Sequence, residues 1–361
     1  VLMAAPTGRA AKRMTESTGR NATTIHRLLE ALHVGYEFQR DAENPLDCQM
    51  LILDETSMLD VWLMSSVLDA LPADSGLLLV GDKDQLPSVG PGQILGDIIG
   101  SGAIPVVELT EVFRQAKGSR IISNAHRVNS GMLPETAAKG DLDSDFFFWQ
   151  VEDMDRVCDC VVELVCERIP NTFGHDPVNH IQVLCPRNGG SLGTRMLNHK
   201  LQHRLNPPSD SSSEVERAGY VFRTHDKVMV LVNDYDRQVY NGDFGWVANV
   251  NTEETNVVIE IDGRRHKYDF KELDEIALAY AITIHKSQGS EYPAVVLAMS
   301  MQAYTMLQRN LLYTGMTRGK ELVVVVGEPR AVARAVKTQE SIRRWTKLKD
   351  FLQEEGGVVT S

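Results

Sequence analysis

The chain has 361 residues, of which 43% are hydrophobic and 24% charged, values typical of a globular protein with two or three domains. No apolar run approaches the roughly 18 residues that a membrane helix needs, and no signal peptide precedes the first apolar segment, so we expect a soluble cytoplasmic protein. The formal net charge of −12 excludes a surface that is basic throughout.

The charge is unevenly distributed along the chain. Residues 1–40 carry six Lys and Arg against three Glu, and residues 303–349 carry ten against three. Residues 41–110 carry one Lys against twelve acids. A protein that holds one nucleic-acid strand in a channel needs only a local basic lining, which this distribution allows. Solvated helix faces are the alternative interpretation, above all for Arg330 to Lys349.

The five cysteines are too few and too scattered for a disulfide framework. Cys158, Cys160 and Cys166 match no standard zinc spacing. They fall in the segment Met154 to Ile169, whose apolar residues recur at helical spacing. We therefore predict that these thiols pack in a core.

The chain opens with an apolar strand, Val1 to Ala5, which runs into the sequence PTGR. Ala10 to Ser17 has the pattern of a helix. Thr23 or Thr24 can cap a further helix, which we expect to extend through Leu32.

The next two predicted strands each end in acidic residues. Met50 to Leu53 is apolar on both faces, as a central parallel strand requires, and Asp54 and Glu55 follow at the edge where open α/β sheets bind ligands. Asp54 can hold Mg²⁺ through its water shell, and Glu55 can deprotonate or orient the water that attacks a γ-phosphate. The strand Leu77 to Val80 runs into GDKDQ, which places Gln85 where an amide can sense a phosphate. Two ordinary strand ends with solvated acids are the alternative, which the recurrence of the pattern disfavours.

Strands alternate with helices from Met50 to about Gly118 and again from Ser119, a pattern typical of doubly wound sheets. The second region contains the strand Ile181 to Leu184 and a polar linker at 207–214. Residues 226–273 then contain short strands separated by turn sequences, which predicts a small β-barrel inserted in the second α/β region. The α/β pattern resumes with strands at Leu278 to Thr283, Ala294 to Ala298 and Leu322 to Val326, and a helix at Asn310 to Thr317.

Seven motifs occur in a fixed order: PTGRAA at 6–11, TIHRLL at 24–29, LDETSMLD at 53–60, GDKDQLPSVGPG at 81–92, FRQA at 113–116, TIHKSQGSEYP at 283–293 and LLYTGMTRGK at 311–320. Together they resemble the RecD type of superfamily 1 DNA helicases, the family of the exodeoxyribonuclease V alpha subunit. The sequences NDY at 233–235 and NGDFG at 241–245 resemble the family pattern around its inserted SH3-like domain.

The resemblance implies an α/β fold of two RecA-like P-loop NTPase lobes, with ATP between them and single-stranded DNA across their top. We expect the first lobe at 1–117, the SH3-like insert at 217–276, and the second lobe at 118–216 and 277–361, including a C-terminal tail. The implied function is an ATP-dependent DNA helicase that translocates 5′ to 3′ in DNA repair or recombination. ATP and Mg²⁺ are its cofactors, and single-stranded and duplex DNA are its partners.

The resemblance also implies roles for individual residues. Asp54 and Glu55 match the Walker B pair, and Gln85 matches the γ-phosphate sensor. Arg114 and Arg318 match the family's two arginine fingers, which face the nucleotide from the second lobe. Glu291 matches the position that contacts the nucleotide sugar. Arginine fingers stabilise the charge that develops on the transferred phosphoryl group. For the two arginines, a surface ion pair is the alternative.

The positions that touch the DNA strand in the family correspond to Pro6, Thr7, Arg9, Thr24, His26, Ser88, Val89, Thr283, His285 and Lys286. Backbone amides, hydroxyls and a few cations suit a motor that must release each phosphate as it steps. A structural histidine is the alternative for His26 and His285. The polar insert His33 to Asp47, which contains Tyr36 and Phe38, corresponds to the pin that splits the duplex, with a plain loop as the alternative.

The chain departs from the family pattern in one respect, because no G-x-x-x-x-G-K-[ST] phosphate loop occurs in it. In RecD-type helicases this loop lies shortly upstream of the strand that corresponds to Val1 to Ala5. We therefore expect a fragment cut within the first lobe, inactive alone, with apolar surface exposed near Val1 to Ala5. A degenerate, non-hydrolysing DNA-binding or regulatory module is the alternative function. Because the sequence shows no separate cluster of metal-binding carboxylates, nuclease activity would require a partner subunit of a helicase–nuclease complex.

Overall fold

A computed structural model describes residues 1–32, 37–109, 118–138, 140–209, 213–234, 236–339, 344 and 346–356. The chain divides into two compact units, Val1–Arg114 with Ser341–Ser361, and Gln115–Glu340. Among the described residues, no helix has the length and apolar character needed to cross a membrane.

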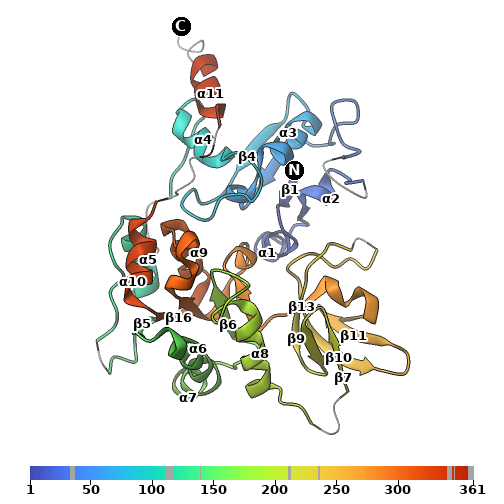
Figure 1. Cartoon of the computed structure of the whole chain (residues 1–361). Coiled ribbons are helices and arrows are strands. Elements are labelled where there is room, and N and C mark those ends of the chain that lie inside the picture. The colour runs from blue at the N-terminus through green and yellow to red at the C-terminus, as the bar shows by residue number, and fades with distance from the viewer. Residues whose placement is uncertain are drawn as a thin grey trace. The chain divides into compact units, whose positions relative to one another are not determined.

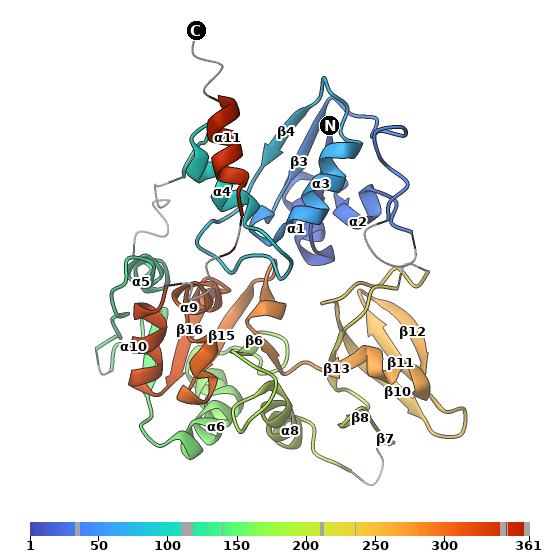
Figure 2. The ribbon, with the colours of Figure 1, turned by 45° about the horizontal axis from the view of Figure 1, so that its top comes forward.

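The first unit is an α/β body built on a parallel sheet (Figure 1). Its strands lie in the order β2-β1-β3-β4, so the carboxyl ends of all four meet at one edge. Helix α3 packs on the sheet through Leu63, Met64 and Val67, which share a core with Leu51 and Leu53 (Figure 2). The elements are β1 (Leu2–Ala5), α1 (Gly8–Thr18), β2 (Thr23–Thr24), α2 (Ile25–Leu28), β3 (Met50–Leu53), α3 (Val61–Ala70), β4 (Gly76–Leu79), α4 (Ile94–Ser101) and α11 (Leu348–Gly356).

Two expectations for this unit differ from the structure. Val1 is 63% exposed, but strand β1 lies between β2 and β3 and Met3, Ala4 and Ala5 are buried, so the expected apolar exposure is limited to the start of the segment. Further apolar exposure occurs at the β4 edge of the sheet, opposite β2, where Leu78 and Val80 are each 43% exposed. Helix α2 ends at Leu28 and not at Leu32, because Glu30 takes a left-handed backbone conformation with φ of 54°.

The last described helix, α11, belongs to the first unit. It packs against α4 (Figure 2), and Leu348 at its start contacts the hydrophobic core of the unit. Residues 277–361 were expected in the second lobe, whereas residues 341–361 group with the first unit in the structure.

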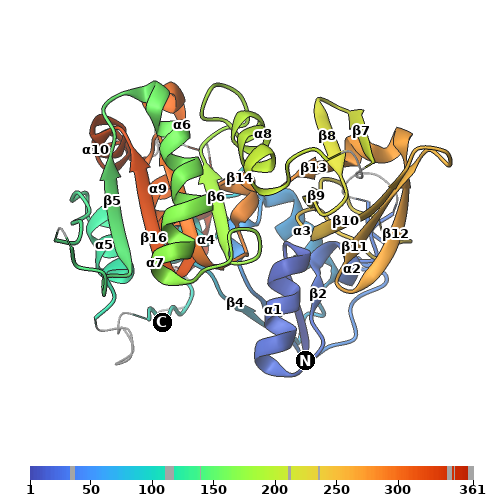
Figure 3. The same ribbon diagram turned by 90° about the horizontal axis from the view of Figure 1, so that it is seen from below.

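The second unit is a five-stranded parallel sheet in the order β14-β6-β15-β16-β5. Helices α6 and α8 cover one face of this sheet, and α5, α9 and α10 cover the other (Figure 3). Its elements are α5 (Arg120–Asn129), β5 (Phe146–Gln150), α6 (Met154–Glu163), a π-helical turn (Leu164–Arg168), α7 (Ile169–Phe173), β6 (Ile181–Cys185), α8 (Thr194–Leu205), β14 (Ala281–Thr283), β15 (Tyr292–Met299), α9 (Arg309–Met316), β16 (Gly319–Gly327) and α10 (Pro329–Lys337).

A β-rich insert completes the second unit. Its antiparallel sheet has the order β12-β11-β10-β9-β13, beside a hairpin of β7 and β8. The strands are β7 (Glu214–Arg217), β8 (Tyr220–Arg223), β9 (Lys227–Val230), β10 (Phe244–Asn251), β11 (Asn256–Ile261), β12 (Arg264–Asp269) and β13 (Ile276–Leu278). The predicted strand Leu278 to Thr283 is therefore two strands: β13 closes the insert, and β14 starts again in the parallel sheet.

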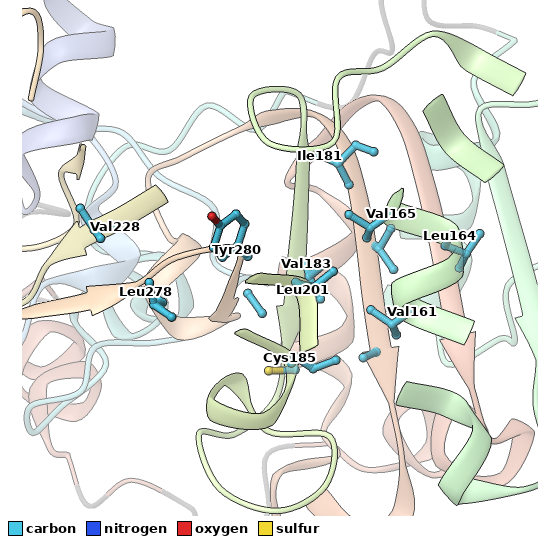
Figure 4. Packing of buried hydrophobic residues seen from close by; sticks show 14 of the residues in the cluster. Val161, Leu164, Val165, Ile181, Val183, Cys185, Leu201, Val228, Leu278 and Tyr280 are labelled. Atoms are coloured by element: carbon cyan, nitrogen blue, oxygen red, sulfur yellow. The ribbon is translucent and has the colours of Figure 1, made fainter. Parts of the chain in front are cut away.

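One hydrophobic core joins the insert to the parallel sheet. Val161 and Val165 pack near Val183, and the same core continues to Val228 in the insert (Figure 4). Cys158 and Cys160 are buried in it, and all five cysteines are reduced, which confirms the prediction of core packing for these two thiols. Burial raises the pKa of both thiols, so they stay protonated near neutral pH.

Candidate functional site

The carboxyl edge of the first sheet brings several predicted site residues onto consecutive strands. Thr24 ends β2, Pro6 and Thr7 follow β1, and Asp54 and Glu55 follow β3. The backbone N–H of Asp54 donates to the carbonyl of Ala4 at 3.0 Å, which continues the ladder one residue past β3. The acids predicted for nucleotide chemistry thus lie beside the β1 turn predicted for DNA.

Asp54 and Glu55 form a tight turn at this edge. The Asp54 Oδ1 accepts a hydrogen bond from the Glu55 backbone N–H at 2.8 Å. Glu55 has a left-handed backbone with φ of 52° and ψ of 39°, a conformation that costs about 1–3 kcal/mol for a residue with a side chain. Mg²⁺ keeps most of its waters and needs only one or two carboxylates beside substrate phosphates, so the Asp54 carboxylate fits such an ion.

Thr56 holds this turn against the neighbouring strand, a role that the sequence analysis missed. It is 1% exposed, and both its backbone N–H and its hydroxyl donate to the Val80 carbonyl, at 3.0 and 2.9 Å. A Cβ at Gly81 would lie 2.7 Å from the Thr56 hydroxyl oxygen, so only glycine allows this approach. The signal for this pair was the sequence itself: a hydroxyl directly after the acids and a glycine directly after the next strand.

Gln85 lies in a turn that Asp82 organises. The Asp82 carboxylate accepts hydrogen bonds from the Asp84 backbone N–H at 3.0 Å and from the Gln85 side-chain amide at 3.1 Å. The Gln85 amide is therefore oriented by its own loop.

Three predicted DNA-binding threonines cap helical turns. The Oγ1 of Thr7 accepts from the Ala10 N–H and that of Thr24 from the Arg27 N–H, both at 3.2 Å. The Thr283 Oγ1 accepts from the Lys286 N–H at 3.3 Å. Because each bond uses the hydroxyl as an acceptor, the O–H donor of each threonine can still serve a phosphate oxygen.

His26 is partly buried between elements of the first unit. Its ring lies 5.9 Å from the ring of Phe38, and Phe38 also contacts the core. Burial lowers the pKa of His26, and the charge of Asp60 opposes this shift. His26 therefore has a packing role.

Pro6 and Arg9 are half-buried at the β1 turn. Tyr36 lies outside the described residues.

Ser88 and Val89 differ sharply in exposure. Ser88 is 4% exposed, and its hydroxyl donates to the Gly90 carbonyl at 3.1 Å. Val89 is 92% exposed. Pro91 is exposed as well, whereas the Ser88 side chain is bonded within the loop.

In the second unit, the predicted DNA contacts follow β14. His285 and Lys286 lie in a short 3-10 turn after Thr283, and burial lowers the pKa of both side chains. The Lys286 Nζ donates to the side-chain oxygen of Asn241 at 3.3 Å. Asn241 belongs to the β-rich insert, so the insert helps to hold this lysine.

The predicted nucleotide contacts of the second unit lie at the amino ends of β15 and β16. Arg318 is 3% exposed, and its guanidinium donates to the carbonyls of Thr314 and Ser290 at 3.2 and 3.3 Å. Glu291 forms an ion pair with Lys320 at 3.1 Å. Tyr292 donates its backbone N–H to the Arg318 carbonyl at 2.8 Å, which brings Glu291 and Arg318 to neighbouring positions. Arg114 lies outside the described residues.

Three protein-family models match separate parts of the chain. Residues 1–91 match an AAA domain, residues 197–261 match the SH3 domain of ATP-dependent RecD-like DNA helicases, and residues 278–326 match the C-terminal domain of UvrD-like helicases.

Two curated proteins are similar along almost the whole chain. The ATP-dependent RecD2 DNA helicase of Deinococcus radiodurans is 34% identical over 347 residues, which cover 96% of this chain and 46% of that protein. The RecBCD enzyme subunit RecD of Mycolicibacterium smegmatis is 30% identical over 383 residues, covering 99% of this chain and 66% of that protein. The chain thus spans about half the length of the first relative and two-thirds of the second.

Among solved structures, the Pif1 helicase from Bacteroides in complex with ADP-AlF3 and single-stranded DNA is similar in fold. Its TM-score is 0.56 at 19% identity, covering 99% of this chain and 87% of that one. The fold is thus α/β, with two parallel sheets of RecA-like lobes and an antiparallel SH3-like insert, as the sequence predicted.

Proposed function

Because this chain belongs to the RecD-like family of superfamily 1 DNA helicases, we propose that it forms the motor part of an ATP-dependent DNA helicase. In this proposal the motor moves 5′ to 3′ on single-stranded DNA, separates duplex DNA, and acts in repair or recombination. The M. smegmatis relative is named as a RecBCD subunit, which supports partner subunits as a second class of partner.

The observation that carries the proposal is the turn at Asp54 and Glu55, on the sheet edge that also holds Thr7 and Thr24. The Asp54 carboxylate would hold Mg²⁺, which supplies positive charge to the phosphates when bound. Glu55 orients and deprotonates the attacking water. Its backbone takes a left-handed conformation, and the next residue, Thr56, is bonded to the Val80 carbonyl of the neighbouring strand, which supports a fixed position for the turn.

The remaining roles are assigned to residues in both units. Gln85 senses the γ-phosphate, and Asp82 orients its amide. Arg114 and Arg318 act as arginine fingers, and Glu291 contacts the nucleotide sugar. For Arg318 the role requires that its guanidinium exchange its bonds to Thr314 and Ser290 for phosphate oxygens. The DNA-binding set is that given by the sequence, with Ser88 acting through the shape of its loop.

We propose that the 361 residues do not hydrolyse ATP by themselves, since none of them forms a G-x-x-x-x-G-K-[ST] loop. Such a loop supplies the lysine and the backbone amides that hold the β- and γ-phosphates. We call the protein that carries these residues together with a phosphate loop the loop-complete form. We expect DNA-stimulated hydrolysis from the loop-complete form only. Robust hydrolysis by the 361 residues would contradict this proposal.

The test of the function is ATP hydrolysis by the loop-complete form, with and without single-stranded DNA. We expect Glu55→Gln to lower DNA-stimulated turnover by about 100-fold or more while ATP binding persists, since general base catalysis contributes on this order. Glu16→Gln, an exposed acid on α1, is the matched control and should leave turnover unchanged. Glu55→Gln turnover within twofold of wild type would remove Glu55 from the base role. A wild type that binds DNA but never hydrolyses ATP would favour the non-hydrolysing module.

A further inference from the structure

The loop Ser88–Gly92 is tied to a residue from the far end of the chain. Arg344 lies in the first unit, 252 to 256 residues from its partners in this loop. One guanidinium nitrogen, Nη2, donates to the Ser88 carbonyl at 2.6 Å. The other, Nη1, donates to the carbonyls of Gly90 and Gly92 at 2.7 Å each and to the Ser88 hydroxyl at 3.2 Å.

The opposite side of the loop is packed as closely. A Cβ at Gly90 would lie 2.0 Å from the Asp60 carboxylate, and one at Gly92 would lie 2.3 Å from Val61. The Val61 N–H donates to the Pro91 carbonyl at 3.0 Å. The loop is therefore held between the start of α3 and the Arg344 guanidinium, while the Val89 side chain is 92% exposed and Pro91 is exposed as well.

The segment that follows Arg344 is itself fastened to the helix that follows the loop. The Thr346 hydroxyl donates to the Asp97 carboxylate on α4 at 2.7 Å, and Gln353 on α11 donates to the Ser101 carbonyl at 3.3 Å. Leu348 contacts the unit's core. The position of Arg344 is thus fixed by several contacts besides those that it makes with the loop.

The charge of Arg344 matters for a strand of phosphates. Three backbone carbonyls that converge on one point carry partial negative charge and would repel a phosphate nearby. The guanidinium neutralises them with several donors in a planar fork, which a lysine ammonium cannot reproduce.

We propose that Arg344 is a positioning residue for DNA binding, which holds Ser88–Gly92 in the shape that presents Val89 to the strand. The C-terminal segment 344–356 is then part of the DNA-binding apparatus of the first unit. This inference rests on the proposed function for its consequence in DNA binding, whereas the holding of the loop is a property of the chain alone.

The first arm of the test measures the concentration of single-stranded DNA that half-saturates ATP hydrolysis by the loop-complete form. Arg344→Ala should raise this concentration about tenfold, because charge-assisted hydrogen bonds are lost. Arg344→Lys should fall between Ala and wild type. DNA-free hydrolysis and the KM for ATP should stay unchanged. A variant that failed to fold would lose this hydrolysis too, so the two outcomes can be distinguished. Arg334→Ala, which removes an arginine stacked on Tyr304 in the second unit, is the matched control.

The second arm measures amide hydrogen exchange in the 361-residue chain. Arg344→Lys should accelerate exchange at residues 86–92 and leave β3 unchanged. A half-saturating DNA concentration within twofold of wild type for Arg344→Ala, or unchanged exchange at 86–92, would overturn the proposal. If wild type shows no DNA-stimulated hydrolysis while exchange responds as expected, the proposed function fails and the holding role of Arg344 stands.

Discussion

Thr56 illustrates how a single hydroxyl helps to hold the turn at Asp54 and Glu55. It follows the strained residue Glu55 and joins the end of β3 to the end of β4 through the Val80 carbonyl. Loss of this bond would remove one contact that stabilises the left-handed conformation of Glu55. Strained residues persist only where several surrounding contacts fix them.

Thr56→Val tests this role with a side chain of nearly the same shape. The Val80 carbonyl keeps the backbone bond, so we expect a loss of about 1 kcal/mol in the free energy of unfolding. Urea denaturation followed by circular dichroism measures it, and DNA-stimulated hydrolysis by the loop-complete form should fall as well. Thr56→Ser keeps the hydroxyl and is the control. Equal stability and turnover for Thr56→Val and wild type would contradict the role.

His26 predicts a dependence of stability on pH. Burial lowers its pKa below the ordinary 6.5, so the unfolded chain takes up this proton more readily than the folded one. Its contribution to stability is present above pH 6.5 and is lost as the pH falls toward the lower, folded pKa. We expect His26→Gln to weaken the loss of stability between pH 7.5 and 5.5, measured by urea denaturation. The same pH dependence in variant and wild type would show that another group causes it.

At the scale of elements, the strands rich in Val, Ile and Leu were the most predictable. The strands around 50–53, 181–184, 294–298 and 322–326 are close to β3, β6, β15 and β16, because runs of Val, Ile and Leu suit strands buried on both faces. The strand Leu278 to Thr283 was not predictable, since its two halves pair with different sheets. The placement of α11 on α4 was equally hidden, because it depends on contacts between distant segments.

The positions of candidate site residues were predictable where they directly follow a strand in the sequence. Asp54 and Glu55 needed only the end of a strand. The supporting contacts of Thr56 with Val80 and of Arg344 with Ser88–Gly92 join residues 24 or more positions apart. Sequence patterns of strands and helices carry no information on such pairs.

The β4 strand predicts a tendency of the 361-residue chain to associate. It lies at the end of the sheet and exposes Leu78 and Val80, and exposed apolar edge strands invite pairing with other chains. We expect Leu78→Lys to shift the concentration of half-association, measured by analytical ultracentrifugation, upward by about tenfold. Leu68→Lys is the control, because Leu68 is an exposed leucine on helix α3 and not on the edge strand. Identical association of wild type and Leu78→Lys would show that the β4 edge does not mediate association.

The polar insert needs a narrower test than its full replacement. Phe38 contacts the core and Leu46 is buried, so replacing residues 33–47 would damage the unit. We expect a Gly-Ser replacement of residues 33–37 alone to reduce duplex separation about tenfold in the loop-complete form, while hydrolysis on single strands stays within twofold. Normal strand separation by this variant would favour a plain loop over a pin.

At the scale of the whole molecule, the low number of cations predicts a weaker salt dependence of DNA affinity than a protein with a basic surface would show. The net charge is −12, and the proposed DNA-binding set contains one arginine, Arg9, and one lysine, Lys286. Each phosphate neutralised contributes about −0.7 to the slope of log affinity against log salt for single strands. We therefore expect a slope of about −1 to −3, measured by fluorescence anisotropy. A slope steeper than about −5 would indicate a basic surface outside the proposed set.

The most direct test of the account is ATP-dependent strand separation by the loop-complete form on a duplex with one single-stranded tail. The proposed motor loads on the tail and moves 5′ to 3′, so we predict that a 5′-tailed duplex is separated and a 3′-tailed duplex is not, with Glu55→Gln inactive on both. Separation of the 3′-tailed duplex alone would contradict the polarity. Failure to separate either duplex in the presence of ATP and Mg²⁺ would contradict the central claim that these residues form the motor of a DNA helicase.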